Sequence, residues 1–212
     1  MKTFITLFFS IVVTFSVRLY AQEPSKLDLG CSFGYGTQNA APFNSAVYSH
    51  EVFFIKGQLN KELYSIQKLK LEFDFEPTYF LVNHQMLDPL YITPQRAPNY
   101  LEQRAHFLKP MTYSEFSLAV GLIIRYQFID QFSVYIMGSV GPTLIQNETE
   151  RLAKGFAFSD IAGLGFSNNW KKFSIDIRAT VRHLSNANLI FPNSGHNSIN
   201  LEAGVLFPIG KE

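Results

Sequence analysis

Residues 68–76 read KLKLEFDFE, so charged and apolar side chains alternate strictly along this stretch. Successive side chains of a β-strand point to opposite faces, and one face here carries only charges while the other carries only Leu and Phe. A soluble sandwich can turn such a charged face toward water. In a membrane barrel the charges face the lumen instead, where they must pair with basic side chains such as Arg125, Arg178 or Arg182. The stretch therefore predicts a sheet with one apolar face.

Eight segments of the chain have a strand-like pattern. They lie at about 25–36, 46–58, 66–80, 112–127, 130–142, 155–167, 173–185 and 197–207. Strands in lipid must close on themselves because unpaired backbone groups are costly there, and an even strand count is usual. We therefore predict an all-β fold, an eight-stranded antiparallel transmembrane β-barrel of the outer-membrane type. Side chains just fill the interior of a barrel of this size, so no open pore is expected.

The predicted connections alternate in length, as expected for an outer-membrane barrel. Little more than Ile129 and Asp130 separates the fourth and fifth strands, and roughly 168–171 separates the sixth and seventh. The connections at 81–110 and 186–196 are long. Bacterial barrels have short periplasmic turns and longer outer loops, so a periplasmic N-terminus places both long loops outside. The turn predicted at 59–65 is longer than this rule expects.

The first 21 residues resemble a secretory signal peptide. Lys2 supplies a basic start, residues 4–17 are nearly all apolar, and Ala21 offers a small residue at the cleavage site. The apolar run is short for a membrane-spanning helix, although a retained N-terminal anchor is the alternative. The lone Cys31 excludes an internal disulfide and does not follow the cut as in a lipoprotein. Residues 22–212 then form one domain, the barrel.

Composition narrows the partners of this domain. The 18 Lys and Arg residues nearly balance the 17 Asp and Glu residues, and the net charge of +1 gives no reason to expect nucleic-acid binding. The 21 Phe and 10 Tyr residues are many for a soluble domain of this length. In a secreted chain with alternating patterns, this aromatic content favours a transmembrane β-barrel.

The end of the seventh strand carries nucleophile and base chemistry. His183 and Ser185 lie two residues apart and share a face with the apolar stripe that runs back to Phe173. Asn197 opens the apolar stripe of the eighth strand. An imidazole can take the proton of a serine, and an amide can hold the other imidazole nitrogen. We therefore predict that Ser185 is a nucleophile, His183 its base and Asn197 the orienting group, with Asp160 in reserve for that last role.

The loop that follows adds donors for a developing oxyanion, namely Asn186, Asn193 and the Gly195 backbone. A less specific interpretation is that His183 and Ser185 are ordinary polar residues at the membrane interface. The remaining histidines show no metal-ligand spacing, and they are expected at the surface or in the lumen; these are His50, His84, His106 and His196. No metal and no cofactor is expected.

The run His183-Leu184-Ser185-Asn186-Ala187, followed by Pro192-Asn193-Ser194-Gly195, resembles the PagL-type outer-membrane lipid A 3-O-deacylases. The resemblance implies an eight-stranded barrel with a Ser-His-acid triad facing the outer leaflet. It assigns His183 as base and Ser185 as nucleophile, and it matches Asn186 and Asn193 to asparagines of the oxyanion site. The family's glutamate falls on Asn197, which is a departure. Glu202 is close in sequence, but its parity points into the lumen.

The resemblance implies an outer-membrane serine esterase that removes the 3-O-linked acyl chain from lipid A of lipopolysaccharide in the outer leaflet. It also implies export to the bacterial outer membrane through the cleaved signal peptide, and it leaves a homodimer open. One alternative is a non-catalytic eight-stranded barrel with a structural or surface-binding role. Another is a soluble secreted β-sandwich.

Overall fold

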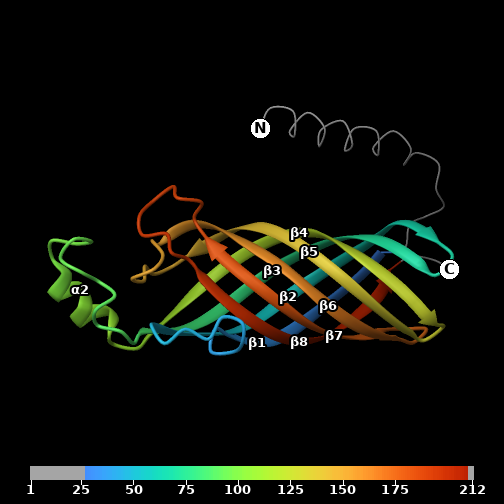
Figure 1. The fold of residues 1–212 in the computed structure, drawn as a ribbon. Helices are drawn as coiled ribbons and strands as arrows, with labels where there is room; N and C mark the ends of the chain where they lie inside the picture. The colour runs from blue at the N-terminus through green and yellow to red at the C-terminus, as the bar shows by residue number, and fades with distance from the viewer. Residues whose placement is uncertain (1–26, 210–212) are drawn as a thin grey trace.

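The computed structural model describes residues 27–209, which form a closed barrel of eight antiparallel strands (Figure 1). The strands are β1 Leu27–Thr37, β2 Tyr48–Ile66, β3 Leu69–Met86, β4 Met111–Ile129, β5 Phe132–Ile145, β6 Gly155–Asn169, β7 Ser174–Ser185 and β8 His196–Ile209. The predicted signal peptide and its cleavage site lie outside the described residues. The fold class predicted from the alternation is confirmed.

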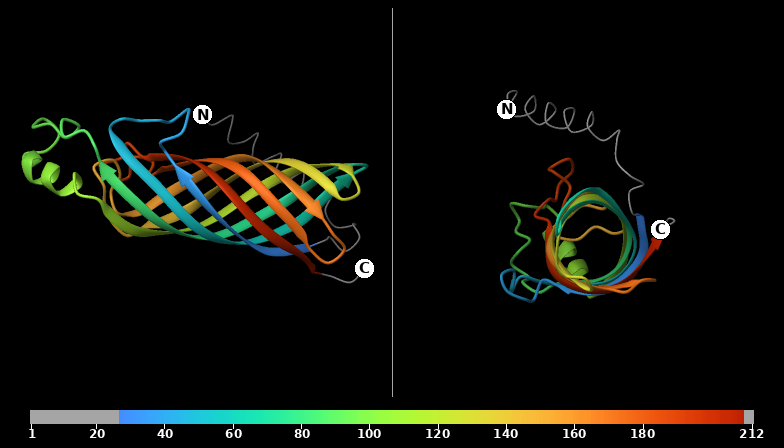
Figure 2. Two further views of the ribbon diagram at one scale, coloured as in Figure 1. Left: turned by 90° about the horizontal axis from the view of Figure 1, so that it is seen from below. Right: turned by 90° about the vertical axis from the view of Figure 1, so that its right-hand side faces the viewer.

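Each strand pairs with its neighbour in sequence, and β1 also pairs with β8, so that Leu27 lies opposite Ile209. The connections 67–68, 130–131 and 170–173 lie at one end of the barrel, called the turn end here. The connections 38–47, 87–110, 146–154 and 186–195 lie at the other, the loop end. Figure 2 shows the longer segments gathered there. Short turns and long loops thus alternate as predicted.

Two predictions about the connections were wrong. The segment 59–65 is not a turn, because β2 continues to pair with β3 as far as Ile66, with one irregularity between Glu62 and Tyr64. Its alternation is hidden by polar residues that face outward near the turn end. The long connection at 81–110 is shorter than predicted, since β3 runs to Met86, and it contains the helix α2 Tyr100–Phe107. In residues 27–209, no helix has the length and apolar character needed to cross a membrane.

The two faces of the sheet differ as the alternation requires. Large apolar side chains cover the outside, among them Ile55, Leu144 and Leu164, which are 60%, 60% and 65% exposed. The lumen holds charged side chains that pair with one another. Arg125 Nε lies 2.8 Å from Glu72 Oε1, and Arg178 Nη1 lies 2.6 Å from Glu76 Oε1. Both ion pairs join a carboxylate on the charged face of β3 to an arginine that was predicted to pair with it.

Two further basic side chains complete this luminal network. Lys56 Nζ lies 2.9 Å from Glu76 Oε2 and 3.0 Å from Glu202 Oε2, and so it joins β2 to β3 and β8. Arg182 pairs with Glu115 on β4 rather than with β3, at 2.7 Å. Burying a charge is costly unless it is paired, and these contacts supply the pairing. Side chains therefore fill the lumen, as expected for eight strands.

Neighbouring positions on β5 provide a test of which face meets lipid. Thr143 is fully buried in the lumen, whereas Leu144 is 60% exposed on the outer wall. In a Cys31→Ala background, which removes the exposed native thiol, a lipid-soluble maleimide should label Leu144→Cys in folded protein. Thr143→Cys should react only after unfolding, although the substitution changes little volume. Rapid labelling of Thr143→Cys in the folded barrel, with Leu144→Cys unreactive, would reverse the assignment of the faces.

Candidate active site

The three residues predicted to act together lie on the outward face of β7 and β8 at the loop end. His183 on β7 lies directly opposite Asn197 on β8 in the strand register. His183 Nδ1 and Asn197 Oδ1 are 2.7 Å apart, and because the amide oxygen can only accept, the imidazole nitrogen donates. Ser185 lies two residues beyond His183 and shares its outward face. The amide therefore fixes the imidazole with Nδ1 protonated and leaves Nε2 free to accept a proton.

Gly195 closes the space above the histidine and the serine. Its φ angle is +68°, a left-handed conformation that favours glycine. A β-carbon at this position would lie 3.2 Å from His183 Cε1 and 3.6 Å from Ser185 Cβ. It would also lie only 2.6 Å from the carbonyl oxygen of Leu184. His183 and Ser185 thus border one small space, which is compatible only with glycine at position 195.

The loop 186–195 is held in shape by its asparagines. The Asn186 backbone N–H donates to Asn193 Oδ1 at 2.7 Å. The Asn186 side chain is buried, and its Nδ2 donates to the carbonyl of Ile190 at 2.6 Å. Asn193 Nδ2 donates to Asn188 Oδ1 at 2.9 Å. The two asparagines predicted for the oxyanion site therefore also build the loop that lies beside Ser185.

Arg151, which the sequence analysis did not single out, fastens this loop to the neighbouring one. Its Nε donates to the Gly195 carbonyl at 2.8 Å and its Nη2 to the Ser194 carbonyl at 3.2 Å. The backbone N–H groups of Ser194 and Gly195 donate to the Arg151 carbonyl at 2.7 and 3.2 Å. Tyr91 O–H donates to Ser194 Oγ at 2.9 Å from a third loop. Strand patterns carry no signal for such contacts between loops.

Asp160 on β6 lies opposite His183 on the side away from Asn197. It is exposed on the outer wall, so a carboxylate and an amide flank the imidazole from neighbouring strands. The register therefore keeps Asp160 as the reserve orienting group. The structure gives the direct hydrogen bond to Asn197.

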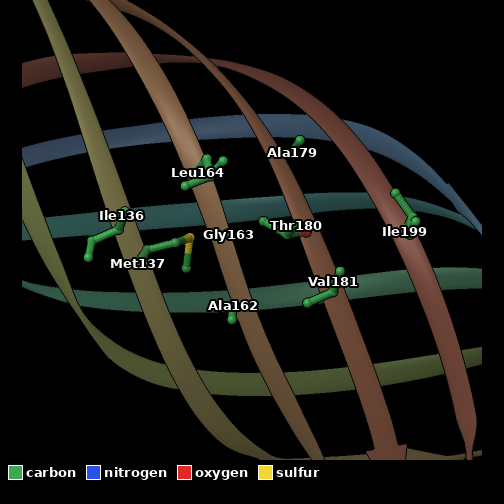
Figure 3. A pocket seen from close by; sticks show the side chains of 9 residues that line it. All are labelled: Ile136, Met137, Ala162, Gly163, Leu164, Ala179, Thr180, Val181 and Ile199. Atoms are coloured by element: carbon green, nitrogen blue, oxygen red, sulfur yellow. The ribbon is translucent and has the colours of Figure 1, made fainter. Parts of the chain in front are cut away.

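An apolar groove leads away from His183 along the outer wall. Its part nearest the histidine has a volume of about 240 Å³ and is lined by Asp160, Ala162 and Val181, among others. A second part, of about 480 Å³, shares Ala162 and Val181 with the first and continues toward the middle of the barrel. Figure 3 shows this second part, where Ala179 on β7 lies between Leu164 on β6 and Ile199 on β8. Small residues on β6 and β7, Ala162, Gly163 and Ala179, thus line the depressions beside the histidine.

The PagL family model, described as lipid A 3-O-deacylase, matches residues 67–205, which is more than half of the 212 residues. The chain belongs to the PagL family. The match includes every residue of the predicted site, and it confirms the resemblance read from residues 183–195. Comparison with curated protein sequences finds none that matches.

A solved structure with a TM-score above 0.5 supports this fold. The crystal structure of the outer membrane enzyme PagL is similar with a TM-score of 0.57 and 16% identity, over 86% of this chain and 99% of that one. Neisserial surface protein A follows with a TM-score of 0.48 and 12% identity, over 87% and 99% of the two chains. At these identities the likeness concerns the fold. The comparisons do not support the homodimer left open from the sequence.

At position 197 the chain presents an amide, not a carboxylate, to His183. Glu202, the other acid near it in sequence, is buried in the lumen and lies 3.0 Å from Lys56. It therefore cannot reach His183 on the outer face, as its parity predicted. The neighbouring candidates for the orienting role on the outer wall are Asn197 and Asp160.

Proposed function

We propose that this protein is an outer-membrane serine esterase that removes the 3-O-linked acyl chain of lipid A, with Ser185 as nucleophile and His183 as base. The observation that carries the proposal is the 2.7 Å contact between His183 Nδ1 and Asn197 Oδ1 on the outer wall. Ser185 lies two residues beyond His183 on the same face of β7. Membership of the PagL family supports the same substrate class. A cleaved signal peptide at residues 1–21 would export the chain.

In the proposed reaction Ser185 Oγ attacks the ester carbonyl carbon while His183 Nε2 takes the serine proton. The Asn197 amide oxygen holds Nδ1–H and keeps the imidazole in the required tautomer and orientation. The tetrahedral intermediate then collapses, and the sugar oxygen leaves with the proton from His183. Water attacks the resulting acyl-serine by the same route and releases the fatty acid, which restores Ser185.

The oxyanion of each tetrahedral intermediate needs nearby donors. Asn193 Nδ2 has two hydrogens and makes one hydrogen bond, to Asn188, so its second hydrogen is a suitable donor. The Asn186 side chain and the Gly195 N–H are bonded to carbonyls in this structure, and each would have to share its hydrogen with the oxyanion. We assign the principal donor role to Asn193 and supporting roles to Asn186 and Gly195.

The position of the site limits its substrates to molecules that lie beside the barrel. The triad faces outward at the loop end, where an outer-membrane barrel meets the outer leaflet. The groove that begins at His183 is mainly apolar. Its small residues Ala162, Gly163 and Ala179 leave room for a hydrocarbon chain. An ester carbonyl at His183 with its acyl chain in this groove matches a lipid standing in the leaflet. Lipid A is such a lipid.

Replacing the nucleophile tests the proposal. Mass spectrometry of lipid A from cells that produce the wild-type protein should show loss of one ester-linked acyl chain at the 3-position. Ser185→Ala should leave lipid A intact, because it removes the hydroxyl that we propose forms the acyl intermediate. Ser174→Ala at the turn end of the same strand is the matched control and should behave as wild type. Undiminished deacylation by a Ser185→Ala protein with the heat-shifted gel mobility of a folded barrel would disprove the mechanism.

The amide at position 197 should determine how well His183 works. Asn197→Ala removes the acceptor of Nδ1–H and should slow turnover by something on the order of the 10²–10⁴-fold supplied by acid–base assistance. Asn197→Glu should keep or increase turnover, because a carboxylate stabilises the imidazolium formed during the reaction better than an amide. Turnover of purified lipid A in detergent measures both. Equal rates for the three proteins would make Asn197 a bystander and transfer the orienting role to Asp160.

Alanine substitutions at two glycines distinguish crowding at the site from backbone strain. Gly195 and Gly155 both have positive φ angles, +68° and +105°, but an added β-carbon at Gly155 meets nothing within 4 Å. Alanine should strain the backbone by roughly 1–3 kcal/mol at either position. Only Gly195→Ala should displace His183 and Ser185, and it should lower turnover at least about tenfold, the effect of ~1.4 kcal/mol at the transition state. A comparable loss in Gly155→Ala would show that the crowding at Gly195 is unimportant.

A further inference from the structure

Three histidines far apart in sequence converge inside the barrel at the loop end. They are His50 on β2, His84 on β3 and His196 on β8, and they are 1–2% exposed. Each can offer one ring nitrogen such that the three nitrogens lie within 4.8 Å of one another. The proposed esterase reaction uses none of them, because they face the lumen and Ser185 faces outward. Sequence spacing did not reveal the group, since the barrel register alone brings it together.

The spacing of two of these nitrogens already suits a metal ion. His50 Nδ1 and His84 Nδ1 are 3.3 Å apart. Zinc–nitrogen bonds of about 2.0–2.1 Å at tetrahedral angles place two ligand nitrogens roughly 3.3 Å apart. The His50 and His196 rings are stacked, with 4.4 Å between their centroids and an interplanar angle of 3°. An imidazole binds a metal through a lone pair in its ring plane, so metal binding requires His196 to turn out of this stack.

The Nε2 atoms of His84 and His196 have hydrogen-bond partners, as expected if the other ring nitrogens bind a metal ion. Glu150 Oε2 lies 2.8 Å from His84 Nε2, and Thr149 Oγ1 lies 3.0 Å from His196 Nε2. Metal-binding histidines usually hold their second nitrogen in this way, often against a carboxylate. His196 Nδ1 is buried and makes no hydrogen bond within residues 27–209. A buried nitrogen without a partner costs free energy, and a bound cation would supply that partner.

Two arginines lie near the histidines, and their charges are already engaged. Arg182 Nη2 contacts Glu115 at 2.7 Å. Arg151 donates to the carbonyls of the loop 186–195 and lies over the Tyr48 ring, 4.4 Å from its centroid. Glu150 adds a buried carboxylate beside His84. Glu115 and Glu150 therefore offset the positive charges of the two arginines, which would otherwise repel a divalent ion.

We propose that His50, His84 and His196 form a transition-metal site, suited to Zn²⁺, in which their Nδ1 atoms are the ligands. Three imidazoles and one water complete a tetrahedral site, with Glu150 as the outer partner of His84. The ion joins β2, β3 and β8 and, through Glu150, the loop 146–154. Its role is structural, because His196 directly follows Gly195 and precedes Asn197 and so fixes the strand that carries the wall of the active site. The proposal does not depend on the esterase activity.

The test measures bound zinc and requires no lipid substrate. Wild-type barrel is refolded in detergent, treated with EDTA, and dialysed against buffered Zn²⁺, and the metal is counted by inductively coupled plasma mass spectrometry. We expect one ion per chain. We also expect a blue Co²⁺-substituted protein, as tetrahedral histidine ligation requires. His106→Ala, which replaces an exposed histidine on α2, is the matched control and should bind one ion.

Variants of the site should separate ligands from their supporting partner. Glu150→Gln should weaken binding by roughly the 10–100-fold associated with loss of an outer partner, and the double variant His50→Ala/His196→Ala by more than that. Gel mobility before and after heating confirms that each variant is folded. A folded wild-type barrel that retains no zinc would overturn the proposal. Zinc binding that persists unchanged in the double variant would overturn it as well.

Discussion

The ion pair between Arg178 on β7 and Glu76 on β3 joins two strands across the lumen, and Lys56 and Glu202 connect to it. None of these charges can leave the lumen, because the other face of each strand meets lipid, where an unpaired charge is prohibitively costly. The network therefore fixes which side chains of β3, β7 and β8 point inward. A one-residue slip of any of these strands would move its charges into the membrane.

That constraint also places the proposed active site. If Arg178 and Arg182 point inward, the odd-numbered residues of β7 must point outward, and His183 and Ser185 are among them. The register of β8 then brings Asn197 opposite His183. The groups that we propose to be catalytic therefore face the membrane as a consequence of charge pairing in the lumen. The loops add the remaining part, since Arg151 holds Gly195 over the histidine and the serine.

The sequence predicted those parts of the molecule that depend on alternation. The faces of β3, β5 and β7, the eight strands, and the outward position of His183 and Ser185 all follow from a period of two. The continuation of β2 to Ile66 and the helix α2 were missed, because mixed polar segments give no clear period. The role of Arg151 and the meeting of His50, His84 and His196 were missed for another reason. Each arises from contacts between segments that only the closed barrel brings together.

The central claim is that Ser185 on the outer wall is a nucleophile activated by His183. A long-chain alkyl fluorophosphonate reacts covalently with activated serines, and peptide mass spectrometry identifies the modified residue. We expect a single adduct on Ser185 in the folded wild-type barrel and none in a folded His183→Ala protein. Modification of a different serine, or modification of Ser185 that does not require His183, would contradict it.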